Sequence, residues 1–226
     1  MPAKRARPVI FVLAGVNGAG KSSVGGAILK EHGLEWFNPD AFSRQRVAQG
    51  VGKDAADAEA WAYGRSRLEA AIAGGSDFAL KTTLGETTLG GNTITALLAR
   101  AAATHDVVMI FCGLESVESH IARVALRVRH GGHDIPEQRI RERWTRARGN
   151  LISLLPHLKA LQAFDNSLEA APGKTIPPPR LVLETAAGRV LHPAPGDLAA
   201  LKATPGWAKP IVEAALAAHG AQGEET

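Results

Sequence analysis

The chain has 226 residues, of which 45% are hydrophobic and 21% are charged. These values are typical of a globular protein and exclude a disordered or collagen-like chain. The formal net charge is +4, and at about 150 residues per domain the length predicts one large domain with a small addition.

A single cysteine, Cys112, excludes an internal disulfide framework and a zinc site made of cysteines. It lies in the apolar run VVMIFC, where we expect a buried thiol. No apolar stretch approaches the ~20 residues that a membrane helix needs. The basic N-terminus runs into a phosphate-binding motif without a small-residue cleavage site, so we expect a cytoplasmic protein with no signal peptide and no membrane partner.

A phosphate-binding loop follows the first predicted strand. Residues 9–14, VIFVLA, are apolar and rich in β-branched side chains, the pattern of a buried parallel strand. Residues 15–22, GVNGAGKS, match G-x-x-x-x-G-K-[ST] ahead of a helix. Lys21 is expected to reach the β- and γ-phosphates of ATP, and the Ser22 hydroxyl to ligate Mg²⁺. The expected nucleotide-binding residues are Gly15, Asn17, Gly18, Ala19, Gly20, Lys21, Ser22 and Ser23.

Strand and helix patterns then alternate along the chain, which predicts an α/β fold with a doubly wound parallel sheet. We expect strands at 35–40, 78–80 and 107–112, and helices at 54–73 and 93–103. The helix at 54–73 is expected to hold Trp61, Leu68 and Ile72 on one side. No aspartate closes the strand at 107–112, so we expect no ordinary Walker B carboxylate there.

One cleft is expected at the carboxyl ends of these strands, where such sheets bind ligands. The strand EWFNPD would place Asp40 at this edge, beside the phosphate loop and the residues that follow Leu80. Asp40 is the candidate base for an acceptor hydroxyl; a helix-capping role is the alternative.

Two arginine-bearing helices follow and predict a lid over polyphosphate. Residues 121–148 hold eight arginines against three acidic residues, where a nucleic-acid-binding face would mix Lys and Arg more widely. Ser116 can cap a first helix, Gly131-Gly132 can end it, and Pro136 can start a second. Arginines bind phosphate in a bidentate manner, whereas a solvated helix face is the alternative. His133 could bind phosphate or fix the turn. We expect at least one catalytic residue among Arg139, Arg141 and Arg143, with Arg143 preferred by its position after GGHDIP.

The last segment has a different composition, with eight of the 13 prolines after position 170. Two apolar runs flank Ala186-Ala187-Gly188 and predict a β-hairpin, and a closing helix is expected over 210–219. We therefore divide the chain into a main domain, 1–170, and a C-terminal hairpin and helix appendage, 171–226, packed on it.

The motifs together resemble the zeta toxins and their relatives among the P-loop kinases. The resemblance rests on GVNGAGKS, FNPDAFS, ETTLGGNTI, RVALRVRHGGHDIP and FDNS, in the family's order over roughly residues 8–170. It implies a P-loop kinase fold and phosphorylation of UDP-N-acetylglucosamine on a sugar hydroxyl. It also implies that Asp40 acts as base, that the lid arginines clamp phosphates, that a Glu-Thr-Thr segment holds the substrate, and that an antitoxin protein is a candidate partner.

The chain departs from that family after the third strand. Lys81-Thr82-Thr83 follows the strand, and the near-repeat Glu86-Thr87-Thr88 comes five residues later. Alignment from the strand puts Lys81 at the family's acidic position, whereas alignment from the following helix puts Glu86 there; the longer identical stretch favours Glu86. The candidate substrate-binding residues are Asp40, Lys81, Thr82, Glu86, Thr87, Thr88, Arg123 and Arg127.

The sequence thus predicts a kinase that uses ATP and Mg²⁺ to phosphorylate a small hydroxylated metabolite, with a nucleotide sugar as the named candidate. The alternatives are a nucleotide-binding regulator with little turnover, and a kinase of an antibiotic or an RNA end.

Overall fold

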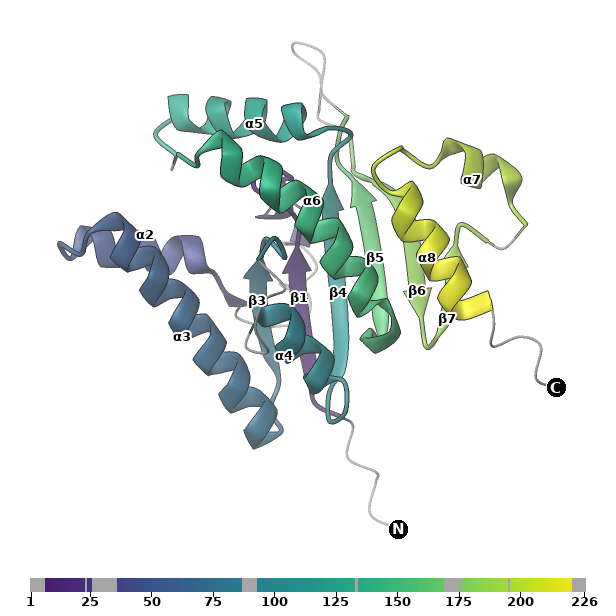
Figure 1. Cartoon of the computed structure of the whole chain (residues 1–226), viewed down its shortest axis with the longest axis horizontal. Helices are drawn as coiled ribbons and strands as arrows, with labels where there is room; N and C mark the ends of the chain where they lie inside the picture. Colours follow the sequence, from purple (N-terminus) through teal and green to yellow (C-terminus); the bar gives the residue numbers. More distant parts are fainter. Residues whose placement is uncertain are drawn as a thin grey trace.

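The computed structural model describes residues 7–22, 24–25, 36–86, 93–132, 134–168, 175, 177–194 and 196–220. Within these residues the strands form one sheet in the order β2-β3-β1-β4-β5-β6-β7 (Figure 1). The strands are β1 Val9–Ala14, β2 Trp36–Phe37, β3 Phe78–Thr82, β4 Asp106–Gly113, β5 Ala160–Asp165, β6 Arg180–Ala186 and β7 Arg189–His192. The helices are α2 Pro39–Ala48, α3 Lys53–Gly74, α4 Ile94–Ala101, α5 Val117–Arg129, α6 Glu137–Leu154, α7 Leu198–Ala203 and α8 Lys209–Gly220, with a short 3₁₀ turn at Leu155–His157.

The first five strands are parallel, which confirms the predicted α/β fold. The strand order reverses at β1, since β3 and β2 lie on one side of it and β4 and β5 on the other. A reversal of this kind opens a crevice at the carboxyl ends of the strands. The loop after β1 therefore begins at the point of the sheet best suited to a ligand. Among the described residues no helix is long and apolar enough to cross a membrane.

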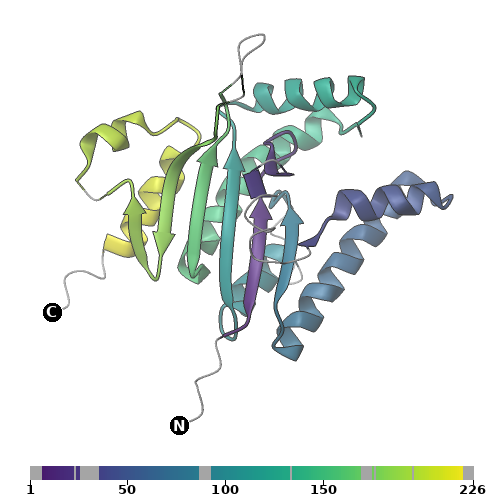
Figure 2. The same cartoon turned by 180° about the vertical axis from the view of Figure 1, so that it is seen from behind.

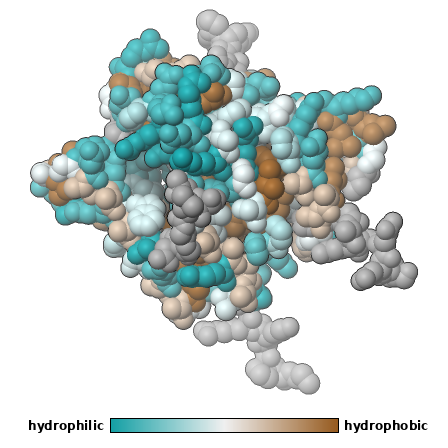
Figure 3. Space-filling view, in the orientation of Figure 1, coloured by the Kyte–Doolittle hydropathy of each residue, from teal (hydrophilic) through white to brown (hydrophobic). Residues whose placement is uncertain are grey.

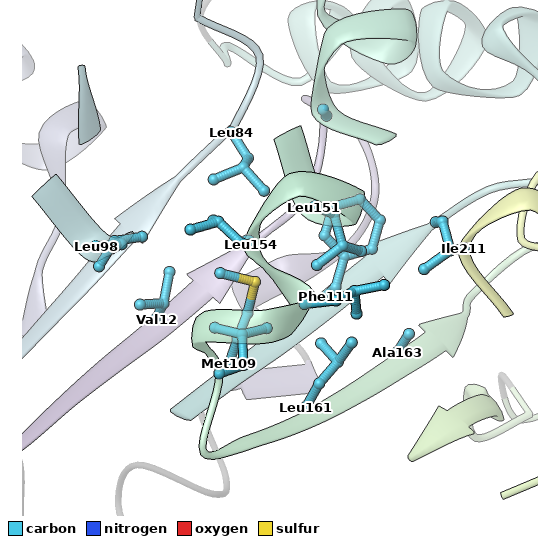
Figure 4. Packing of buried hydrophobic residues seen from close by; sticks show 14 of the residues in the cluster. Val12, Leu84, Leu98, Met109, Phe111, Leu151, Leu154, Leu161, Ala163 and Ile211 are labelled. Carbon is cyan, nitrogen blue, oxygen red and sulfur yellow. The ribbon is translucent and has the colours of Figure 1, made fainter. Parts of the chain in front are cut away.

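The main core lies between the sheet and helices α4, α6 and α8, which cover one of its faces (Figures 1 and 2). Side chains that alternate along the strands meet Leu98 of α4, Leu151 and Leu154 of α6 and Ile211 of α8 (Figure 4). A smaller apolar cluster on the other face contains Leu13, Ala19 and Cys112. Burial raises the pKa of the Cys112 thiol to about 12, as expected for an inert core thiol.

Asp40 lies in a helix, so the expected strand over 35–40 was wrong beyond Phe37. Only Trp36 and Phe37 form β2, and α2 begins at Pro39. The side chain of Asn38 accepts a hydrogen bond from the Asp40 N–H, so Asn38, not Asp40, caps the helix. Pro39 occupies the first helical position, where its missing N–H has no consequence. The first turn of α2 still holds Asp40 near the sheet edge.

Trp61 of α3 is 46% exposed, whereas Leu68, expected on the same side of the helix, is fully buried. The buried face of α3 is instead made of small residues and one leucine: Ala56, Ala60, Gly64, Leu68 and Ala71. A side chain at Gly64 would collide with the ring of Phe37. The absence of a side chain at Gly64 therefore lets α3 approach β2 closely.

The C-terminal hairpin is present and continues the central sheet. β6 pairs antiparallel with β5, and β7 pairs antiparallel with β6. Helix α8 adds Ile211, Val212 and Ala215 to the same apolar core as the parallel strands. The expected boundary between residues 170 and 171 lies outside the described residues.

Candidate active site

The loop after β1 has the backbone that a phosphate cradle needs. Gly15, Gly18 and Gly20 all have positive φ angles, of 136°, 84° and 80°, which side-chain-bearing residues rarely adopt. A side chain at Gly15 would lie 2.2 Å from the carbonyl oxygen of Cys112, and one at Gly18 would lie 2.8 Å from that of His120. The glycines are therefore required both by conformation and by the close approach of β4 and α5.

Lys21 is buried at the base of this loop and is only 6% exposed. Its Nζ atom donates to the backbone carbonyl oxygens of Gly15 at 2.5 Å and Val16 at 3.1 Å. Burial, with the charge of Lys81 nearby, lowers the pKa of Lys21 to about 7. An anion in the loop would offset that cost of burying the charge, because an opposite charge favours the ammonium form.

Two side chains outside the loop hold its backbone in place, and neither was singled out in the sequence analysis. The buried ring of His120 bonds through Nδ1 to the carbonyl oxygen of Asn17 at 2.8 Å. The amide of Asn166 donates to the carbonyl oxygen of Ala19 at 3.0 Å. His120 lies four residues, about one helical turn, before Val124, so its place on the inward face of α5 was detectable from spacing.

The FDNS segment at the end of β5 is thus a support for the phosphate loop. Besides Asn166, it contributes Asp165, a buried carboxylate that accepts hydrogen bonds from Ser167 at 2.5 Å and from the Trp207 indole at 3.3 Å. These bonds tie the end of β5 to the segment before α8. Asp165 is therefore occupied by structural partners.

Asp40 and Lys81 form an ion pair beside the phosphate loop. Lys81 Nζ lies 3.0 Å from Asp40 Oδ2 and 3.4 Å from Ser22 Oγ. Burial opposes ionisation of Asp40, but Lys81, Lys21 and Arg127 together outweigh it and hold the pKa of Asp40 below its usual value. The Lys81 side chain therefore contacts both the carboxylate of the expected base, Asp40, and the hydroxyl of the expected metal ligand, Ser22.

A cleft of about 520 Å³ extends from this point between α2, α3 and the segment 127–146. Its lining includes Asn17 and Lys21 from the loop, and Lys81 and Thr82 from the end of β3. Cationic side chains on the walls outnumber acidic ones by nine to five. Arg65 of α3 lies over the Trp61 ring, 5.1 Å from its centroid, and both side chains border the cleft. Such a lining favours an anionic ligand.

The arginines of the expected lid divide into two groups. Arg139, Arg143 and Arg146 border the cleft together with Arg127, and hydrophilic residues gather over α5 and α6 on the face seen in Figure 3. Arg143 NH1 donates to the Asn17 side-chain oxygen at 2.8 Å, and burial lowers its pKa below the usual value.

Arg141 and Arg123 do not line the cleft. Arg141 pairs on the surface with Glu118 and Glu137, so it is the weakest of the three expected catalytic arginines. Arg123 lies beside Gly18 of the phosphate loop instead of on the wall that Arg127 occupies. Arg123 and Arg127 are one helical turn apart in α5, and only Arg127 borders the cleft.

Lys81 and Glu86, the two residues that could take the family's acidic position, have different partners. Lys81 is the fourth of the five residues of β3; it pairs in register with Leu13 of β1 and lies next to Asp40. Glu86 borders the cleft, but its Oε1 accepts hydrogen bonds from the Thr95 backbone N–H at 2.7 Å and the Thr95 hydroxyl at 3.0 Å. Glu86 therefore stabilises the first turn of α4. Ser23, Thr87, Thr88 and His133 lie outside the described residues.

No protein-family model and no curated protein matches this chain. Among solved structures it is similar to a chain of AvrRxo1-ORF1:AvrRxo1-ORF2 with sulphate ions, at 17% identity and a TM-score of 0.56, over 82% of this chain and 61% of that one. A structure of AvrRxo1-ORF1:-ORF2 with ATP gives the same TM-score and identity, over 82% and 60%. The PezAT toxin–antitoxin system of Streptococcus pneumoniae follows at 16% identity and a TM-score of 0.49, over 73% of this chain and 72% of that one.

The chain spans about three fifths of the length of the first two of these structures. At 17% identity the likeness concerns the fold. The predicted α/β architecture with a phosphate loop after its first strand is therefore the fold of this protein, and it is shared with AvrRxo1-ORF1:AvrRxo1-ORF2.

Proposed function

We propose that this protein is a kinase that transfers the γ-phosphoryl group of ATP to a hydroxyl group of a small, anionic metabolite. The observation that carries the proposal is the Lys81 ammonium group, which contacts Asp40 on one side and Ser22 on the other. A carboxylate that can accept a proton thereby lies next to the end of a phosphate loop, as a kinase requires.

The residues present fit a nucleoside triphosphate. The positive φ angles of Gly15, Gly18 and Gly20 permit the converging N–H groups of a phosphate cradle, and Lys21 supplies a buried charge. Ser22 is the residue that would hold Mg²⁺ together with the phosphates, and the ion would neutralise part of their charge. Arg143, Arg139 and Arg127 border the same cleft and can bind the remaining phosphate oxygens.

Asp40 takes the acceptor's proton in this proposal. The acceptor oxygen forms a bond to the γ-phosphorus as the bond between that phosphorus and the β–γ bridging oxygen breaks. The products are a phosphate ester and ADP, and the proton passes through Asp40 to solvent. Lys21 and the lid arginines stabilise the charge on the transferring group, since they are fixed before the reaction begins.

For the acceptor we propose a nucleotide sugar of the UDP-N-acetylglucosamine kind. The support is the motif resemblance around Asp40 and the lid, and the excess of cations along a cleft of about 520 Å³. Thr82 and Asp40 offer oxygen atoms that can hold a sugar hydroxyl. The same resemblance makes an antitoxin protein a candidate partner.

The test is incubation of the purified protein with Mg-ATP and, separately, UDP-N-acetylglucosamine, a nucleotide-free sugar, an aminoglycoside and an RNA with a free 5′-hydroxyl. Mass spectrometry of each mixture should show one added phosphate on the nucleotide sugar. Phosphate on only one of the other acceptors would reject the nucleotide sugar but retain the kinase. A protein that binds ATP but transfers no phosphate, either to these acceptors or to the metabolites of a cell extract, would be a regulator.

A further inference from the structure

Lys81 is held in one place by its surroundings. It is the fourth residue of β3, and its side chain is only 12% exposed although it ends beside an open cleft. Its ammonium group is shared between the Asp40 carboxylate, at 3.0 Å, and the Ser22 hydroxyl, at 3.4 Å. A lysine on a rigid strand that reaches two expected active-site groups differs from an ordinary surface ion pair, which has two mobile partners.

Asp40, in contrast, has freedom to move. Its side chain is 45% exposed and lies in the first turn of α2. The N–H groups of that turn already bond to Asn38, so they do not hold the Asp40 carboxylate. Without a partner across the cleft, this half-exposed carboxylate would be free to turn away from the phosphate loop.

Lys81 opposes that turn by binding Oδ2 of Asp40. Lys21, Arg127 and Arg143 also act on Asp40 by their charge, but these cations belong to the loop and the lid, where phosphates would engage them. Lys81 comes instead from β3, which lies between β2 and β1 in the sheet. With Oδ2 held by the lysine, Oδ1 is left to accept the proton of an acceptor hydroxyl.

We propose that Lys81 is a positioning residue that holds the Asp40 carboxylate toward the phosphate loop, so that it acts on the reaction through Asp40 and not as a ligand of the acceptor. This proposal rests on the kinase function proposed above. A kinase site that places a lysine here keeps its base oriented before the acceptor arrives, which reduces the cost of alignment in the transition state.

The experiment compares wild type with Lys81→Met, Lys81→Arg, Asp40→Asn and the double variant Lys81→Met/Asp40→Asn. Lys202→Met, an exposed lysine of α7, is the matched control for loss of one positive charge. Melting temperatures establish that each variant folds. Values of kcat and KM are then measured for ATP and for the acceptor identified above.

Lys81→Met should lower kcat on the order of 10²-fold, with the KM values changed less than about threefold, since misplacement of a reacting group by an ångström has this effect. The double variant should be no slower than Asp40→Asn, because Lys81 has nothing to position once the carboxylate is lost. Lys81→Arg should recover most of kcat. The proposal would be overturned if the fold-losses in kcat of the two single variants multiplied in the double variant. It would also be overturned by a rise in the acceptor KM with kcat unchanged, which would make Lys81 a direct substrate ligand.

Crystal structures of wild type and Lys81→Met provide a second measurement that does not depend on turnover. The Asp40 carboxylate should lie against the lysine in wild type and adopt a different rotamer, directed away from the phosphate loop, in the variant. An unmoved carboxylate would contradict the positioning role. Wild type that transfers no phosphate would count against the proposed function, while the crystallographic comparison still decides the role of Lys81.

Discussion

Arg143 donates a hydrogen bond from NH1 to the side-chain oxygen of Asn17, 126 residues earlier in the chain, at a distance of 2.8 Å. The contact joins α6 to the phosphate loop. Gly85 is also pressed against Arg143, since a side chain at Gly85 would lie 2.6 Å from the Arg143 Cβ atom. The guanidinium group is thereby fixed between the loop and the end of β3, where a γ-phosphate would lie in the proposed kinase.

Arg143→Ala is therefore expected to lower kcat on the order of 10²–10³-fold, as removal of one fixed donor from a developing charge does elsewhere. Arg141→Ala is the matched control, because Arg141 lies on the same helix but pairs with Glu118 and Glu137 outside the cleft. The measurement is steady-state kinetics with the identified acceptor. Equal losses in the two variants would show that α6 arginines act through the overall charge of the lid.

The Glu86 carboxylate is expected to matter for stability more than for turnover, because its Oε1 is bonded to both the N–H and the hydroxyl of Thr95. Glu86→Ala should lower the free energy of unfolding by about 1–2 kcal/mol, a typical value for a lost helix cap. Glu86→Gln keeps an acceptor oxygen and should retain most of the stability and activity. Chemical denaturation and kinetics measure both. A Glu86→Gln protein that is stable but inactive would assign the carboxylate to the substrate.

His120 should make the folded state sensitive to acid. Burial lowers its pKa to about 4, although the hydrogen bond to Asn17 raises it in part. An unfolded histidine titrates near pH 6.5, so between pH 6.5 and 4 the unfolded chain binds a proton that the folded one does not. The stabilising contribution is present above pH 6.5 and is lost as the pH falls to 4, by about 3 kcal/mol at 1.36 kcal/mol per pKa unit.

The check on His120 is the free energy of unfolding from urea titrations at several pH values, for wild type and His120→Gln. The difference between the two proteins should change by that amount between pH 7 and pH 4, since glutamine does not titrate. Parallel pH dependence in both proteins would mean that folding does not lower the pKa of His120.

Hydrophobic patterns were sufficient to predict most of the fold. The run VIFVLA predicted β1, and Ile94, Leu97, Leu98 and Ala101 on one side predicted the buried face of α4. On α3 the pattern named Leu68, which is buried, but not Ala56, Ala60 and Gly64, which carry little hydrophobic signal. The close approach of Gly64 to Phe37 is revealed only by the structure.

Local motifs placed the phosphate loop and Asp40 near each other, but they could not give the partners of each side chain. The near-repeat at 81–90 offered both Lys81 and Glu86 for the acidic position of the family's motif. The register between β3 and β1, which places Lys81 beside Leu13, cannot be predicted from the motif. Arg127 and Arg123 share one helical stripe, yet only Arg127 borders the cleft. Contacts such as Asn166 with Ala19 join residues 147 apart and have no pattern along the chain.

The central claim is transfer of a phosphoryl group from ATP at the site that contains Lys21. The most direct measurement uses ATP labelled on the γ-phosphate, a small-molecule cell extract, and purified wild type beside Lys21→Ala. Lys21 is buried beneath the loop carbonyls, so its loss should reduce the rate on the order of 10²–10³-fold or more, with folding verified by thermal melting. We predict labelled metabolite with wild type and almost none with Lys21→Ala. Equal labelling by the two folded proteins, or none by wild type that binds ATP, would contradict the account.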